Sequence, residues 1–172
     1  MRKLVAVISF GLFGFAGLAQ ASLIGDTVTA EVQFGGVTAQ GPANALVVDP
    51  GVEFDFGNVD IDVFDASASF FNILGGSVTL DETYLLTDLD WVGQAGEIVG
   101  VLSSSFGGLS IAPVIVTGPH SLSVTLPGST FVGSGAFVNV ALDVVHVPEP
   151  ASLALLGLGL AALGFSRRKK PH

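Results

Sequence analysis

The fold is indicated most clearly by a stretch in which apolar and acidic residues alternate, VEFDFGNVDIDV at residues 52–63. Val52, Phe54 and Phe56 alternate with acidic residues, and the same alternation resumes at Val59. Successive side chains of a β-strand point to opposite faces of the sheet, so a period of two predicts strands with one buried and one solvated face. Gly57-Asn58 interrupts the pattern with residues that favour a turn. The stretch therefore predicts two short strands separated by a turn.

The same kind of pattern extends over most of the segment 22–147. Alternating or short apolar runs recur at 26–34, 67–74, 77–80, 83–87, 97–103, 109–116, 120–126 and 136–147. Gly, Pro, Asn and Asp occupy the gaps between them, and no window has the period of an amphipathic helix. About eight to ten short strands at this spacing predict an all-β domain, an antiparallel β-sandwich for which a jelly roll is one candidate topology.

The charge of this segment is strongly one-sided. The chain has 172 residues, with 6 Lys or Arg, 15 Asp or Glu and no Cys. All Lys and Arg residues lie at the two ends, whereas all acidic residues lie between Asp26 and Glu149, so the segment 22–150 has fifteen negative charges and no Lys or Arg. Such a segment repels nucleic acid and anionic lipid, which excludes nucleic acid as a partner. Without cysteine, neither a disulfide nor a thiolate metal site is possible.

The first 21 residues have the three parts of a secretory signal peptide. Arg2-Lys3 is a positive start, residues 4–18 are an apolar run expected to be helical, and Ala19 and Ala21 are the small residues that signal peptidase requires. We expect signal peptidase to cut after Ala21, so the exported protein begins at Ser22. The alternative is an uncleaved N-terminal membrane helix.

The end of the chain has a second targeting pattern, also in three parts. Pro148-Glu149-Pro150 ends regular structure, because proline cannot continue a strand ladder. Residues 151–165 form an apolar run that would span about 22 Å as a single membrane helix, short against a ~30 Å hydrocarbon core. Basic residues then close the chain and are expected to stay in the cytoplasm. These basic residues are Arg167, Arg168, Lys169 and Lys170.

Together these parts resemble the PEP-CTERM sorting signal of Gram-negative bacteria. The resemblance implies processing by exosortase, a membrane-embedded enzyme, and delivery to the cell surface or the extracellular matrix of bacteria that make exopolysaccharide. We therefore expect a signal peptide at 1–21, an exported acidic β-sandwich at 22–147, and a sorting segment at 148–170 that anchors the protein transiently in the inner membrane. A plain C-terminal membrane anchor is the alternative.

The exported segment offers little for catalysis. It has no Cys or Lys, and its histidines, His120 and His146, fall beside a turn and at the end of the last predicted strand. A hydrolytic triad needs a histidine oriented by a carboxylate against a serine, and no nucleophile-elbow pattern is present. Carboxylate pairs that could hydrolyse a glycoside are too common here to be specific. We predict that the protein is not an enzyme and has no cofactor other than a calcium ion.

Calcium is the small ligand that the sequence favours most. Hard oxygen ligands suit Ca²⁺, and extracellular calcium is abundant enough for weak sites. Two groups of aspartates are the candidate ligands: Asp60, Asp62 and Asp65, then Asp88 and Asp90. The alternative is that these carboxylates are only the solvated faces of strands, since no EF-hand loop pattern is present.

Trp91 follows the second group and has two interpretations. Its indole is a candidate platform for stacking against a sugar ring, or it fills the core. Our preferred prediction is a structural surface or matrix protein, associated with exopolysaccharide in a biofilm. The alternative is a carbohydrate-binding β-sandwich module assisted by Ca²⁺.

Overall fold

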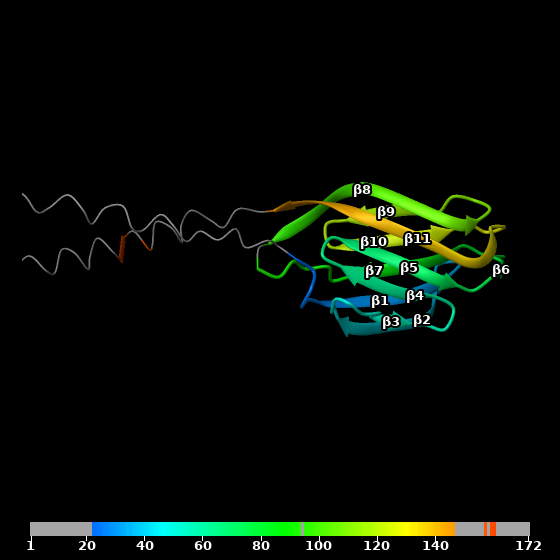
Figure 1. Cartoon of the computed structure of the whole chain (residues 1–172), viewed down its shortest axis with the longest axis horizontal. Helices are drawn as coiled ribbons and strands as arrows, with labels where there is room; N and C mark the ends of the chain where they lie inside the picture. The colour runs from blue at the N-terminus through cyan, green and yellow to red at the C-terminus, as the bar shows by residue number, and fades with distance from the viewer. Residues whose placement is uncertain (1–21, 94, 147–156, 158, 161–172) are drawn as a thin grey trace, which may run out of the picture.

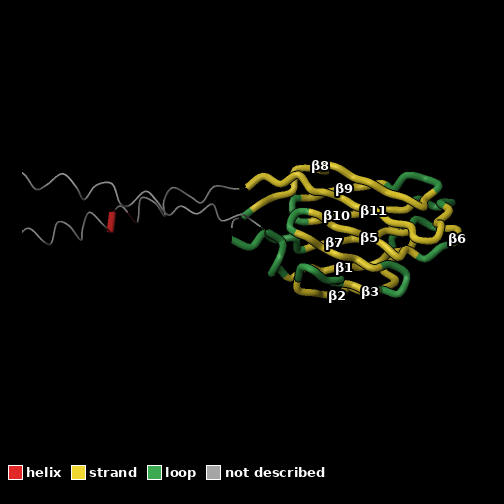
Figure 2. Tube along the Cα trace, in the orientation of Figure 1, coloured by secondary structure: helices red, strands yellow, loops and turns green. Residues whose placement is uncertain are grey.

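The computed structural model describes residues 22–93, 95–146, 157, 159 and 160. The described residues between 22 and 146 form strands, turns and bends, and none of them is helical (Figures 1 and 2). The strands are β1 (Thr27–Phe34), β2 (Val37–Leu46), β3 (Phe54–Asp55), β4 (Asp60–Phe64), β5 (Ser67–Ile73), β6 (Gly76–Ser77), β7 (Glu82–Thr87), β8 (Gly96–Leu109), β9 (Val114–Gly118), β10 (Ser121–Leu126) and β11 (Phe131–His146). The helices predicted for the two ends of the chain, at 4–18 within the signal peptide and at 151–165, fall almost wholly outside the described residues.

Two antiparallel sheets make up the domain. The first has five strands in the order β2-β1-β7-β10-β9. The second has six, with β3-β4-β5-β11-β6 in order and β8 paired with β11 as well. The inner faces of the two sheets share one hydrophobic core, in which the ring of Phe70 on β5 stacks on that of Tyr84 on β7 with centroids 5.7 Å apart. The predicted all-β, antiparallel, sandwich-like fold is confirmed.

Strict alternation decides which side chains reach this core. In β1, Val28, Ala30 and Val32 are fully buried, and the residues between them are partly exposed. In β4, Ile61 and Val63 are fully buried, and the residues beside them, Asp60, Asp62 and Phe64, are partly exposed. Each fully buried Val, Leu, Ile or Phe side chain stabilises the fold by about 1.5–3 kcal/mol. This core holds together a domain that has no disulfide.

The topology is not that of a jelly roll. In a jelly roll, successive strands pass from one sheet to the other. Here β1 and β2 are neighbours in one sheet, as are β9 and β10, and β3, β4 and β5 follow one another in the second sheet. The short turns between these strands, such as Gly35-Gly36, favour pairing of sequence neighbours over crossing between the sheets.

The chain enters and leaves the domain at one end of the sandwich, which we call the tail-proximal end (Figure 1). Ser22 forms an antiparallel bridge with Val92. His146, the last residue of β11, lies opposite Gly96, the first residue of β8. The short strand β6 lies at the opposite, distal end.

Candidate functional site: the tail-proximal end and the sorting motif

The loop that follows β7 closes the tail-proximal end with two buried apolar side chains. Leu89 is 1% exposed and Trp91 is 7% exposed. A Cβ placed on Gly96 would lie 3.3 Å from Trp91 Cδ2 and 3.4 Å from His146 Nδ1, so the indole lies against the start of β8 and beside the last residue of β11. Of the two interpretations of Trp91, the structure favours the core residue, because a ring covered in this way offers no face to a sugar.

Polar groups next to Leu89 and Trp91 hold the β7–β8 loop in place. His120 Nδ1 lies 2.9 Å from Asp90 Oδ1 and 3.2 Å from the carbonyl oxygen of Leu89. The Asp90 backbone N–H donates to Asp26 Oδ2 over 2.8 Å, and the Leu89 N–H donates to the His120 carbonyl over 3.1 Å. His120 and Asp90 thus join the β9–β10 turn and the β7–β8 loop at the surface.

The last strand, β11, ends at the tail-proximal end. β11 ends at His146, and the residues next in the chain are Val147 and the Pro148-Glu149-Pro150 triplet. The sorting residues predicted from sequence lie outside the described residues. They are Ala19, Ala21, Pro148, Glu149, Pro150, Arg167, Arg168, Lys169 and Lys170.

A family model for the PEP-CTERM protein-sorting motif matches residues 146–169. The chain carries a PEP-CTERM sorting motif. The match begins at the last residue of β11 and includes the proline triplet, the apolar run and the basic residues up to Lys169. No curated protein and no solved structure matches the chain.

The PEP-CTERM motif implies that the protein is exported, processed by exosortase and sorted at the membrane toward the cell surface. Because the motif begins where β11 ends, the whole sandwich lies on its N-terminal side. Within the part of the chain that the structure describes, no helix is long and apolar enough to cross a membrane.

The first group of predicted calcium ligands is spread along one hairpin. Asp60 and Asp62 lie on the outward face of β4, and Asp65 lies in the turn between β4 and β5. Asp60 Oδ2 accepts a hydrogen bond of 2.5 Å from the side-chain amide of Asn72. The backbone carbonyl of Asp65 accepts from Leu23 N–H over 3.1 Å. The three residues therefore have separate surroundings.

Asp62 has an acidic neighbour that the sequence analysis missed. Phe54 pairs with Ile61 in the β3–β4 hairpin, so the same register places Glu53 opposite Asp62. Glu53 is held there because its two carboxylate oxygens accept the backbone N–H groups of Val48 and Val63, over 3.0 and 2.7 Å. Burial, the Glu53 carboxylate and then Asp49 raise the pKa of Asp62 to about 6. The sequence could have predicted this neighbour from the turn at Gly57-Asn58, because the position of the turn fixes which residues of β3 and β4 face each other.

The second group of predicted calcium ligands diverges. Asp88 Oδ2 accepts a hydrogen bond of 2.6 Å from the Thr29 hydroxyl, whereas Asp90 faces His120. Among the described residues, no three His, Asp or Glu side chains gather closely enough to hold a metal ion. The calcium site stays a prediction, and the carboxyls of Glu53 and Asp62 face each other across the β3–β4 hairpin.

Proposed function

We propose that the protein is a non-enzymatic component of the cell surface or extracellular matrix, delivered by exosortase and structural or associated with the exopolysaccharide of a biofilm. The observation that carries the proposal is the PEP-CTERM match beginning at the last residue of the sandwich. Processing of the motif would leave a bare β-domain, and its distal end would face away from the membrane while the tail is still attached.

The surroundings of His120 support a role without catalysis. His120 is engaged by the Asp90 carboxylate and the Leu89 carbonyl, and in the described part of the chain no hydrogen bond joins it to a serine.

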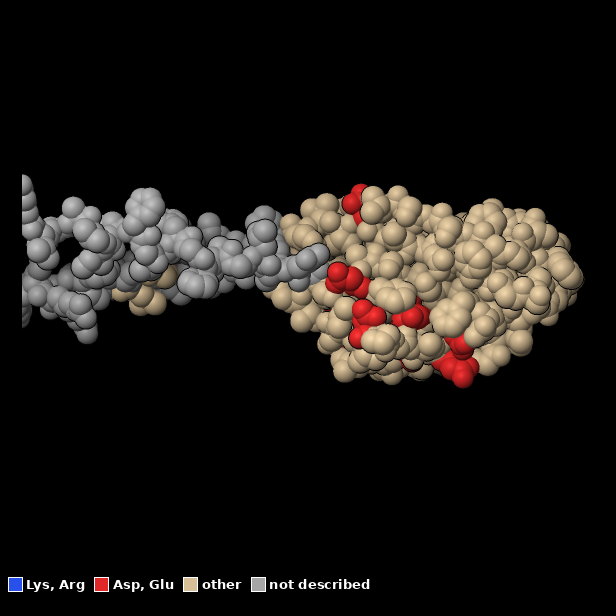
Figure 3. All heavy atoms as spheres, viewed as in Figure 1, with Lys and Arg blue, Asp and Glu red and all other residues tan. Residues whose placement is uncertain are grey.

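Fourteen of the acidic residues lie in the sandwich without Lys or Arg, and the visible face in Figure 3 shows acidic but no basic side chains. Such a surface keeps a secreted domain soluble and repels copies of itself.

Processing can be tested on protein exported from a host that has exosortase. We expect the intact mass of the secreted form to correspond to a chain that starts at Ser22 and ends near Glu149. Glu149→Ala should leave the protein in the membrane fraction, and Asp143→Asn, a matched change within β11, should be released normally. Secreted protein that retains Arg167–Lys170 would show that the segment is a plain anchor and would overturn exosortase sorting.

A calcium-assisted carbohydrate-binding module is the second candidate function. A shallow trough of about 470 Å³ crosses β5, β11 and β8 on the outer face of the second sheet. Its lining is rich in hydroxyl and amide groups that can bond to sugar hydroxyls, including Ser69, Ser105 and Asn139. Ser69 donates to Asn139 Oδ1 over 2.8 Å, which orients the amide. A glycan array run with Ca²⁺ and with chelator tests this function, and the absence of calcium-dependent binding would remove it.

A further inference from the structure

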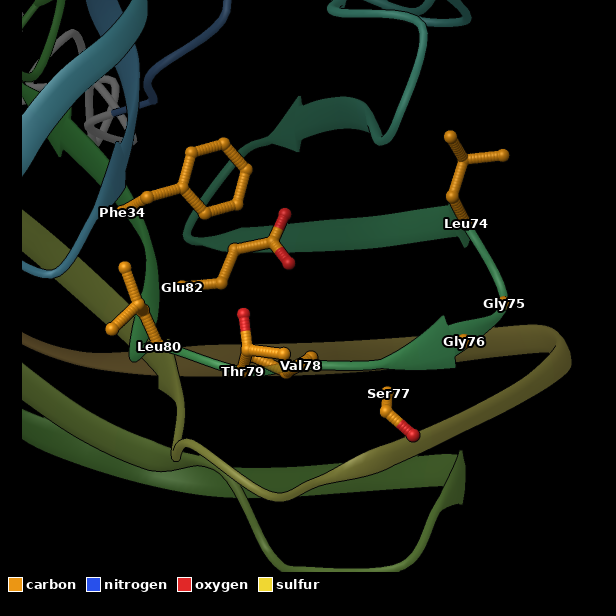
Figure 4. A pocket seen from close by; sticks show the side chains of 9 residues that line it. All are labelled: Phe34, Leu74, Gly75, Gly76, Ser77, Val78, Thr79, Leu80 and Glu82. Atoms are coloured by element: carbon orange, nitrogen blue, oxygen red, sulfur yellow. The ribbon is translucent and has the colours of Figure 1, made fainter.

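The distal end of the sandwich contains a hollow of about 280 Å³ that the sorting motif does not explain (Figure 4). Its walls come from the end of β1, the segment 74–80 and the start of β7. Leu74 and Leu80 are 64% and 58% exposed, and Phe34 at the end of β1 is 37% exposed. The hollow therefore offers an apolar wall to solvent at the end opposite to Ser22 and His146. Its size suits a ligand of a few ring or chain atoms rather than a polymer.

One carboxylate, that of Glu82, points into this hollow between Phe34 and Thr79 (Figure 4). Glu82 Oε1 accepts hydrogen bonds from the Asn58 side-chain amide over 2.7 Å and from the Tyr84 hydroxyl over 3.1 Å. Burial raises the pKa of Glu82, although these two bonds act in the opposite direction. Burial beside Glu82 raises the pKa of Tyr84 well above its usual range, so Tyr84 remains a donor. The carboxylate is therefore held in one orientation, and Oε2 has no hydrogen-bond partner within the described part of the chain.

The charge of Glu82 has no structural partner. A glutamine could accept the same two hydrogen bonds through its carbonyl oxygen without the cost of desolvating an anion. No Lys or Arg occurs anywhere between residues 22 and 150 that could neutralise the carboxylate. A half-buried carboxylate next to an aromatic ring and aliphatic side chains matches an organic cation, because the carboxylate pairs with the charge and the ring attracts it further.

We propose that this hollow binds a small organic ammonium compound, whose charged group pairs with Glu82 Oε2 and whose body contacts Phe34, Leu74 and Leu80. The Thr79 hydroxyl, which points toward Glu82 in Figure 4, is placed to accept a second N–H of the ammonium group. An amino sugar and a simple alkyl amine share this chemistry, and the hollow has both hydroxyl and apolar walls to contact either. The proposal stands apart from the sorting of the protein, since the hollow lies away from the tail-proximal end.

Titration of the full chain in non-ionic detergent tests the proposal, with amide chemical shifts as the readout. The probes are glucosamine, cyclohexylammonium and the uncharged N-acetylglucosamine. We expect saturable shifts at residues 74–82 with at least one ammonium probe and none with N-acetylglucosamine. Preference for glucosamine would identify an amino sugar as the source, and preference for cyclohexylammonium would identify an alkyl amine. Both outcomes support the ammonium site.

Variants separate pairing with Glu82 from general attraction to an acidic surface. Glu82→Gln keeps the acceptor for Asn58 and Tyr84 and should weaken ammonium binding at least tenfold without lowering the melting temperature. Glu97→Gln removes the same charge from an exposed position on β8, at the tail-proximal end, and should leave binding unchanged. Equal weakening by the two variants, equal binding of N-acetylglucosamine, or no saturable shift with any probe would overturn the proposal.

Discussion

Asp62 shows how burial and a facing carboxylate, that of Glu53, set a response of the fold to pH. The pKa of Asp62 is raised from 3.8 to about 6 by burial first and by the nearby carboxylates second. Between these two values the folded protein binds more protons than the unfolded chain. Stability should therefore rise as the pH falls from 7 through about 6, and this contribution should be complete near pH 4. Glu82, whose pKa is also raised by burial, acts in the same direction.

Asp62→Asn should stabilise the mature protein at pH 7 by about 1–2 kcal/mol, a figure that already allows for solvent screening of a partly exposed group. The variant should also lose much of the gain in stability between pH 7 and pH 5, because the group that titrates is gone. Urea denaturation at the two pH values measures both effects. Glu97→Gln serves as the matched control and should keep the full pH dependence. If Asp62→Asn kept the full pH dependence of stability, another carboxyl would be responsible for it.

Trp91 is the single tryptophan of the chain, so its fluorescence reports on one place. Because the indole is 7% exposed, we expect emission at short wavelength and weak quenching by acrylamide in the folded protein. Trp91→Ala should destabilise the fold by about 3–5 kcal/mol through loss of buried surface and a residual cavity, and Trp91→Phe by less. Strong quenching of the folded protein, relieved by added sugar, would instead restore the sugar-stacking interpretation.

The strands that the sequence predicts well are those with one buried and one solvated face. β1, β4, β7 and β10 alternate strictly, so each was predicted to within a few residues. β2 was missed because it is an edge strand whose side chains are mostly exposed, so its sequence VTAQGPANAL carries no alternation. Pairing with β1 along its length, rather than its own pattern, makes it a strand.

Glycine pairs misled the prediction in β8 and β11. Gly107-Gly108 and Gly133–Gly135 were taken as gaps between strands, but they lie within these two long strands, where the register between them shifts. Gly108 has φ of 72°, and a Cβ there would lie 2.8 Å from Ala136 Cα. The glycine is needed for close approach of two backbones, and local sequence does not distinguish this from a turn.

Gly108→Ala should therefore be much more damaging than an alanine at another glycine with positive φ. Gly36, in the β1–β2 turn, has φ of 80° with no atom near its Cβ position, so Gly36→Ala costs only the left-handed backbone strain, about 1–2 kcal/mol. Gly108→Ala has the same strain and also forces β8 away from β11, which adds roughly 1–3 kcal/mol. Urea denaturation of both variants measures the difference. Equal costs would mean that the two strands separate freely at this point.

At the scale of the whole molecule, a site is predictable from sequence when its residues are contiguous, and much less so when distant segments combine to form it. The sorting motif is contiguous in sequence, so residues 148–170 were sufficient to predict it. The hollow at the distal end needs Phe34, the segment 74–80 and Glu82 to meet. The pairing of β1 with β7 places Phe34 opposite Glu82, and the pairing of β6 with β11 holds the segment 74–80. The sequence nevertheless indicated one property of this hollow. Because the domain has no Lys or Arg, a carboxylate that the fold covers has no such side chain to pair with.

The same charge imbalance makes the response to salt a test of the calcium prediction. Fifteen carboxylates between residues 22 and 150 repel one another without a Lys or Arg among them, so folding concentrates negative charge. Sodium chloride relieves this repulsion by screening alone. A divalent ion that binds only the folded state adds a term that reaches about 2.7 kcal/mol at a hundredfold excess over Kd.

The melting temperature of the mature protein should therefore rise more with millimolar CaCl₂ than with NaCl at matched ionic strength. If the ion binds where Glu53 and Asp62 face each other, Asp62→Asn should reduce the calcium-specific part of the rise in melting temperature. Asp88→Asn should leave that part unchanged, because the Asp88 carboxylate already accepts a hydrogen bond from the Thr29 hydroxyl. A differential scanning measurement of the three proteins in both salts decides the matter. Equal effects of the two salts would make these aspartates a solvated surface only and would remove the calcium-assisted module as a candidate function.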